Sequence, residues 1–158
     1  MNKIVLVGKG ASGKNHLLER FKSRGFRQLI SHTTRPMREG EEDGREYHFV
    51  SEDEFRRMVS GNEFVEFQEF NGNYYGTSVK EWEESDVVIL APQGVGNITR
   101  LGLRKNCFII YVDIPESVRV ERMSGRKGAG EVSSRIESDE AEFLNFTDFD
   151  LRITDPNF

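Results

Sequence analysis

Three short apolar runs alternate with amphipathic segments along this chain. Each run is rich in β-branched residues and bounded by turn signals, as the central strands of a parallel sheet are. The runs lie at Ile4–Val7, Val87–Ala91 and Cys107–Val112. A helical pattern follows each of them, over Lys14–Ser23, Gln93–Leu101 and Glu116–Met123. Because strand and helix alternate, the pattern predicts an α/β fold with a parallel core sheet.

The middle of the chain departs from this alternation. Short segments with alternating aromatic residues predict strands at Glu46–Val50, Phe64–Phe70 and Asn73–Gly76, with a hairpin turn at 70–73. We therefore expect one domain, in which a small mixed β subdomain at about 31–80 is inserted into a core of about 1–30 and 81–158.

Composition narrows the class of protein. A chain of 158 residues fits one domain of ordinary size. Its net charge of −5 argues against a nucleic-acid surface, which is usually basic. The single cysteine, Cys107, forms no internal disulfide, and neither a signal-peptide pattern nor an apolar run of membrane-spanning length is present. We expect a cytoplasmic protein without a nucleic-acid or membrane partner.

A glycine-rich segment follows the first predicted strand and opens the first predicted helix. Residues 8–14 read GKGASGK, which matches the phosphate-loop pattern GxxxxGK in its proper context. Such a loop turns backbone N–H groups inward, the helix N-terminus adds partial positive charge, and Lys14 can reach the β- and γ-phosphates. The predicted ATP-binding residues here are Gly8, Gly10, Ala11, Ser12, Gly13 and Lys14.

The residue after the lysine departs from the usual pattern. Asn15 stands where a Ser or Thr hydroxyl normally binds Mg²⁺. An amide oxygen accepts only a weak metal contact or holds a metal-bound water. We therefore expect Mg²⁺ to arrive with ATP as the cofactor, with Asn15 as a weak ligand. The neighbouring His16 is interpreted as a surface residue.

Two arginines three residues apart, Arg35 and Arg38, lie in a turn-rich stretch. Arginine forks suit a phosphate dianion, because each can donate two parallel hydrogen bonds. Further blocks follow at 44–51 (GREYHFVS), 62–67 (NEFVEF) and 74–77 (YYGT). In their order and spacing, these segments resemble the guanylate kinase family, and the resemblance runs from the phosphate loop to about Asp155.

The resemblance implies a three-layer P-loop NTPase fold and phosphorylation of GMP or dGMP by ATP. It implies that the acceptor phosphate is held by Arg35, Arg38, Tyr47 and Tyr75, and that Ser31, Glu66 and Thr77 face the base. The chemistry is consistent, since guanine offers N1–H and the exocyclic amine as adjacent donors, which one carboxylate can accept together.

The resemblance also implies a short lid at about 122–135. A stretch rich in Gly, Lys and Arg at Met123–Glu131 predicts a mobile loop, and a polar helix follows it from about Glu131 to Asn145. In the family, Arg122 would lie near the adenine, with Arg126 and Arg135 on the phosphates. Charge on the transferring phosphoryl group needs such neutralisation. The expected catalytic residues are Lys14, Arg38, Arg126 and Arg135.

Alternatives to a GMP kinase stay open because the chain departs from the family elsewhere. Ala91 stands where relatives carry an acidic residue, which removes a second contact to guanine and help with the metal. Asp113 ends an apolar run, as a metal-binding acid of P-loop enzymes does, but it follows a different strand from the one that carries that acid in the family. The alternatives are a kinase for another or modified nucleoside monophosphate, and a non-catalytic module that binds phosphopeptides. Lys14 and the lid arginines favour a kinase.

Overall fold

The computed structural model describes residues 3–125 and 128–158, which form two compact units. The first consists of the chain up to Phe26 together with Asp86–Phe158, and the second of Arg27–Ser85. The first holds a parallel sheet with helices and the second a mixed sheet, which confirms the predicted α/β class. In the described ranges, no helix has the length and apolar character needed to cross a membrane.

The sheet of the first unit has four parallel strands in the order β6-β1-β7-β8. They are β1 (Lys3–Gly8), β6 (Val87–Ile89), β7 (Cys107–Val112) and β8 (Leu151–Ile153). Every residue of β1 is buried, because both faces of a central parallel strand are covered. β6 ends before the predicted Ala91, which instead caps α4 ahead of Pro92 in its first turn.

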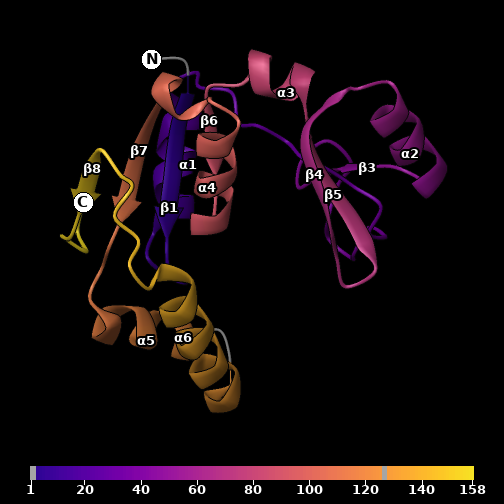
Figure 1. Cartoon of the computed structure of the whole chain (residues 1–158). Coiled ribbons are helices and arrows are strands. Elements are labelled where there is room, and N and C mark those ends of the chain that lie inside the picture. The colour runs from indigo at the N-terminus through magenta and orange to yellow at the C-terminus, as the bar shows by residue number, and fades with distance from the viewer. Residues whose placement is uncertain (1–2, 126–127) are drawn as a thin grey trace. The chain divides into compact units, whose positions relative to one another are not determined.

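Helices follow the strands as the pattern predicts. They are α1 (Lys14–Ser23), α4 (Pro92–Arg100), α5 (Glu116–Ser124) and α6 (Ala129–Phe143), with a short 3₁₀ turn, η1 (Arg104–Asn106). Leu17, Leu18 and Phe21 of α1 pack on alternate strand residues such as Leu6 and Ile110. In Figure 1, α5 and α6 lie beyond the carboxyl ends of β1 and β7.

Helix covers both ends of the stretch Met123–Glu131, for which the sequence predicts a loop. α5 continues through Ser124, and α6 already begins at Ala129 and ends at Phe143. The physical reason is burial on both sides, since Met123 is 3% exposed and Val132 is 8% exposed. Apolar anchors of this kind stabilise helix ends that a polar, glycine-rich composition disfavours.

The mixed sheet of the second unit has the order β3-β2-β5-β4, and its strands are β2 (His32–Thr33), β3 (His48–Phe49), β4 (Phe64–Phe70) and β5 (Asn73–Ser78). β2 pairs with β3 in parallel, and the other neighbours are antiparallel. Asn71 and Gly72 join β4 to β5 with φ values of 50° and 79°. Two successive positive φ values are typical of a tight hairpin turn.

Two helices of this unit, α2 (Glu52–Ser60) and α3 (Val79–Glu84), were absent from the pattern-based prediction. The side chain of Ser51 accepts a hydrogen bond from the Glu54 N–H, and that of Ser78 accepts one from the Glu81 N–H, at 3.1 and 3.0 Å. Each helix therefore begins at a Ser-x-x-Glu sequence. That spacing is a recognised helix-start signal.

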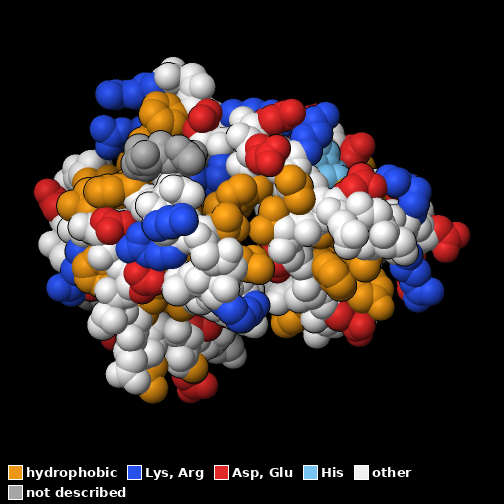
Figure 2. Space-filling view, turned by 45° about the horizontal axis from the view of Figure 1, so that its top comes forward, with side chains coloured by type: hydrophobic (Ala, Val, Ile, Leu, Met, Phe, Trp, Pro, Cys, Tyr) orange, Lys and Arg blue, Asp and Glu red, His pale blue; other side chains and the backbone are white. Residues whose placement is uncertain are grey.

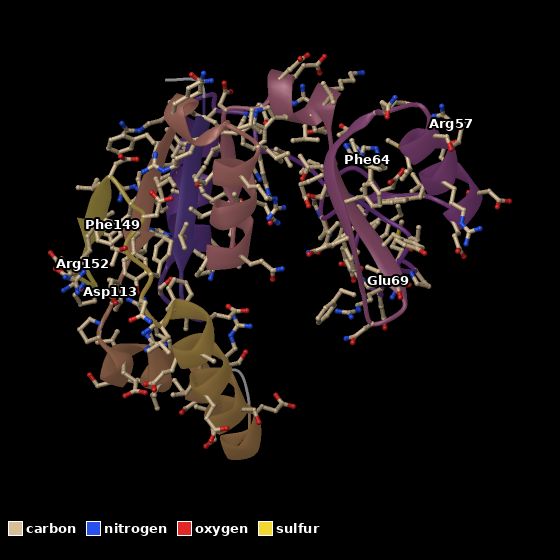
Figure 3. The ribbon with its side chains drawn as sticks, viewed as in Figure 1. Arg57, Phe64, Glu69, Asp113, Phe149 and Arg152 are labelled. Carbon is tan, nitrogen blue, oxygen red and sulfur yellow. The ribbon has the colours of Figure 1, made fainter. Side chains whose placement is uncertain are left out.

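Aromatic side chains form the core of the second unit. The ring of Phe55 is 1% exposed and lies 4.5 Å from that of Phe64 and 5.5 Å from that of Tyr74, centroid to centroid. Arg57 on α2 and Phe64 at the start of β4 are labelled in Figure 3. A Cβ at Gly76 would come within 2.7 Å of the Phe64 ring, so this packing requires glycine there.

Candidate active site

The segment between β1 and α1 curls tightly. Ala11 and Gly13 have left-handed backbone conformations, with φ values of 60° and 98°. A Cβ at Gly8 would lie 2.5 Å from Ser12 Oγ and 3.0 Å from the Val112 carbonyl oxygen, so only glycine fits. The first turn of α1 carries no acidic residue, so its N–H groups and helix dipole keep their partial positive charge.

Lys14 lies back over this loop. Its Nζ donates hydrogen bonds to the carbonyl oxygens of Gly8 and Lys9, at 2.8 and 3.3 Å. Burial lowers the pKa of Lys14, and the positive charge of Arg135 lowers it further. Ser12 Oγ is buried and has no hydrogen-bond partner within the described ranges. A buried hydroxyl without a partner is rare, and a ligand oxygen in the loop is one way to satisfy it.

Arginines from α5 and α6 reach the same loop. Arg122 donates to the Ala11 carbonyl oxygen at 3.0 Å and to the Pro156 carbonyl oxygen at 3.1 Å. Arg135 Nε lies 3.1 Å from Asp139 Oδ1. The predicted Arg126 lies outside the described residues. A cavity of about 290 Å³ adjoins Arg122, and its lining residues are Ala11, Gly13, His16, Arg122, Pro156 and Phe158.

The acidic and amide groups considered for a metal are dispersed. Asp113 lies beside Arg152 (Figure 3) and accepts a hydrogen bond from its Nε. The distance between Oδ2 and Nε is 2.9 Å. Asn15 is exposed in the first turn of α1. Residues 3–125 and 128–158 hold no cluster of three or more His, Cys, Asp or Glu side chains suited to a metal ion.

The second unit holds the predicted phosphate-binding residues. The Arg35 guanidinium donates two hydrogen bonds to the Glu41 carboxylate, both at 2.9 Å, and lies 5.3 Å from the Tyr47 ring centroid. The backbone N–H of Arg38 donates to the same carboxylate at 2.8 Å. These bonds, above all the two from Arg35, lower the pKa of Glu41 to about 2. The Tyr47 and Tyr75 rings lie 5.8 Å apart, so the structure groups Arg35, Tyr47 and Tyr75.

The predicted base-contacting residues lie partly on one sheet face. Glu66 on β4 pairs in register with Thr77 on β5, and Thr77 Oγ1 donates to Glu66 Oε1 at 3.2 Å. Tyr75 lies two residues before Thr77 and therefore on the same face. Ser31 is held through its backbone, because its carbonyl oxygen accepts the His48 N–H at 2.8 Å.

Comparison with known proteins decides the family. The guanylate kinase family profile matches residues 1–158. The chain belongs to the guanylate kinase family. It is 33% identical to the guanylate kinase of Vibrio parahaemolyticus, over 98% of this chain and 80% of that protein, and 30% identical to that of Colwellia psychrerythraea, over 99% and 78%. The crystal structure of guanylate kinase from Anaplasma phagocytophilum is similar, with a TM-score of 0.65 and 25% identity over 99% of this chain and 79% of that one.

Guanylate kinases are nucleoside monophosphate kinases, which are phosphotransferases, so membership places this chain among enzymes of that class. The structure also contains buried polar groups that the sequence analysis missed. Glu81 is 5% exposed, lies 2.9 Å from His48 Nε2 and accepts the Ile30 N–H at 3.0 Å. Asp139 is 1% exposed and accepts a hydrogen bond from the Gly10 N–H. The spacing of four between Arg135 and Asp139 was the available signal, since such residues are neighbours on a helix.

Proposed function

We propose that this protein transfers the γ-phosphoryl group of ATP to GMP or dGMP and so forms GDP or dGDP. The observation that carries the choice of acceptor is the pairing of Glu66 with Thr77 on one face of the β4–β5 hairpin. A carboxylate beside a hydroxyl matches the N1–H and amine donors of guanine together with its O6 acceptor.

The acceptor phosphate belongs, in this proposal, with Arg35, Arg38, Tyr47 and Tyr75. The side chain of Arg35 is 10% exposed and its plane is held by Glu41, so it is pre-organised. Arg38 is exposed, and its backbone N–H shares the same carboxylate. Arg38 can therefore change its side-chain conformation to meet the phosphoryl group as it is transferred.

The donor phosphates belong with the loop at residues 8–14. Inward N–H groups and Lys14 stabilise negative charge on the β- and γ-phosphates. Arg135, together with Arg126, neutralises charge that develops on the transferring group. Arg122 and the cavity beside it receive the adenine. This assignment gives each predicted cation one role in the transfer.

Mg²⁺ is expected to accompany ATP, where it neutralises phosphate charge. The residues present fit a metal held mainly by phosphate oxygens and water, the usual habit of Mg²⁺ at nucleotide sites. Asn15, at the start of α1, is the protein group that would hold it, directly or through a water. A cytoplasmic location remains a prediction of the sequence.

Two other functions compete with this one. Ala91 lacks the carboxylate that relatives use, which favours a kinase for another or modified nucleoside monophosphate. A phosphopeptide-binding module without catalysis would need neither Lys14 nor Arg135. Incubation with ATP and GMP separates the three, since a GMP kinase forms ADP and GDP in equal amounts, measurable by chromatography. ATP consumption that needs a different monophosphate, or binding without any product, would support a competitor.

A further inference from the structure

A buried carboxylate from α6 closes the phosphate loop. Asp139 Oδ2 accepts a hydrogen bond from the Gly10 N–H at 2.9 Å, although 129 residues separate the two in sequence. The contact depends on glycine, because a Cβ at residue 10 would lie 3.1 Å from Asp139 Oδ2 and 2.9 Å from Arg135 Nε. The loop backbone, Arg135 and Asp139 are therefore packed against one another.

Two arginines balance the charge of this carboxylate. Arg135 Nε lies 3.1 Å from Asp139 Oδ1, and Arg119 Nη1 on α5 lies 3.8 Å from Asp139 Oδ2. The side chains of Arg119 and Asp139 are 3% and 1% exposed, whereas that of Arg135 is 43% exposed. A buried carboxylate is costly unless it is paired, so its environment is specified closely.

The position of this contact on Arg135 matters for function. A guanidinium has five N–H donors on three nitrogens, and the nitrogen that forms the ion pair with Asp139 is Nε, 3.1 Å from Oδ1. The Nη1 and Nη2 groups make the fork that binds phosphate in a bidentate way. An ion pair at Nε thus restricts the side chain without using the fork.

We propose that Asp139 is a positioning residue that holds the Arg135 guanidinium beside Gly10, ready for the γ-phosphate of ATP. This inference rests on the proposed function, and it assigns the carboxylate a task that none of the sequence patterns indicated. The proposal differs from one alternative, in which Asp139 only anchors α6 through its ion pair with Arg119. The proposal also differs from a second alternative, in which the Asp139 carboxylate occupies the loop and competes with the phosphate of ATP.

The test compares Asp139→Asn with Glu140→Gln, a matched control that removes one exposed negative charge from the next residue of α6. Asparagine can still accept the Gly10 N–H, but it carries no negative charge to pair with Arg135. The first measurement is the affinity for ATP relative to ADP by titration calorimetry. The preference for ATP should fall about tenfold in Asp139→Asn, the usual effect of losing a bond between charged groups, and stay unchanged in Glu140→Gln.

Kinetics give the second measurement. In Asp139→Asn, kcat should fall about 10- to 100-fold with little change in the KM for GMP, because Arg135 is misplaced rather than lost. Arg135→Gln should have a similar effect, and the double variant should add little to either single one. Additive losses would overturn the proposal.

Other outcomes also decide the question. An unchanged preference for ATP over ADP in Asp139→Asn would mean that Asp139 only anchors α6. Tighter ATP binding in Asp139→Asn would mean that the carboxylate competes with phosphate for the loop. Either result contradicts the proposal. If Asp139→Asn does not fold, Asp139→Glu retains the charge beside Arg119 but shifts the carboxylate, and the same loss of ATP preference is expected. The binding ratio needs no acceptor, so it tests Asp139 even if wild type does not phosphorylate GMP.

Discussion

The hydroxyl of Thr77 donates a hydrogen bond to the carboxylate of Glu66 at 3.2 Å, and the two residues are register partners across β4 and β5. The bond from Thr77 orients the Glu66 carboxylate, which is an acceptor with about four lone-pair positions. This geometry makes Glu66 the most direct test of base choice.

Glu66→Gln should weaken the use of GMP by about 1–3 kcal/mol in kcat/KM, the loss expected when a hydrogen bond to a charged group is removed. Use of adenine and pyrimidine nucleotides should fall far less. Glu69→Gln is the matched control, since Glu69 is exposed and lies three residues further along the same strand. Figure 3 labels Glu69 on this hairpin. Equal losses in the two variants would mean that charge on the strand, and not a base contact, is responsible.

The pair of Arg35 and Glu41 predicts a pH-dependent contribution to stability. The pKa of Glu41 is lowered from 4.5 to about 2, chiefly by the bond from Arg35. A carboxyl group whose pKa is lower in the folded state stabilises that state at pH values above its ordinary pKa. This stabilisation is lost as the pH falls through the lowered pKa of the folded state. Wild type should therefore exceed Glu41→Gln in free energy of unfolding above about pH 4.5, with the difference disappearing towards pH 2.

Denaturant titrations at several pH values measure this difference. Glu42→Gln is the control, because the Glu42 side chain is 71% exposed and lies 3.4 Å from Arg45. Basic and acidic side chains alternate over the face seen in Figure 2, and exposed pairs of this kind contribute little. A difference between wild type and Glu41→Gln that did not change between pH 5 and pH 2 would contradict the assignment.

The loop at residues 8–14 should bind an anion. A crystal structure from sulfate or phosphate buffer is expected to show density within about 3 Å of Lys14 Nζ, with the loop N–H groups directed at it. Lys14 would then exchange its bonds to the carbonyl oxygens of Gly8 and Lys9 for the anion. An empty loop at high sulfate, with Lys14 in its present position, would contradict a phosphate loop.

Asn15 should limit turnover through the metal. Asn15→Ser or Asn15→Thr supplies the hydroxyl that Mg²⁺ usually meets here, so kcat should rise while ATP affinity stays within about twofold. Asn15→Ala, which removes the amide oxygen, should lower kcat. An unchanged or lower rate in the hydroxyl variants, with folding intact, would mean that other groups hold the metal.

Much of the core followed from periodicity. The strands at β1 and β7 and the helix α1 lie where the apolar runs and the 3.6-residue pattern predicted them. Local patterns predict short helices less well when the helix start depends on a single capping residue, as the start of α2 does on Ser51. The extent of α5 and α6 depended on tertiary burial of Met123 and Val132, which composition does not reveal.

Sequence patterns single out residues that would act through their own chemistry, such as Lys14 and Arg35, and their roles stay predictions. Residues that act on other residues were missed. Glu41 holds Arg35, and Asp139 holds Gly10 and Arg135, yet a charged residue in a polar segment gives no sign of burial in the sequence. Contacts between distant segments, such as that between Gly10 and Asp139, exist only after folding.

Acceptor choice is the most direct test of the account as a whole. A coupled assay of ATP consumption should be run with wild type and a panel of GMP, dGMP, AMP, CMP, UMP and dTMP. A site that hydrogen-bonds its base rejects mismatched bases strongly, so kcat/KM for GMP or dGMP should exceed that for every other monophosphate by about 10³-fold or more. Preference for dTMP or a modified pyrimidine monophosphate, or binding of a monophosphate without turnover, would contradict the proposed phosphorylation of GMP or dGMP.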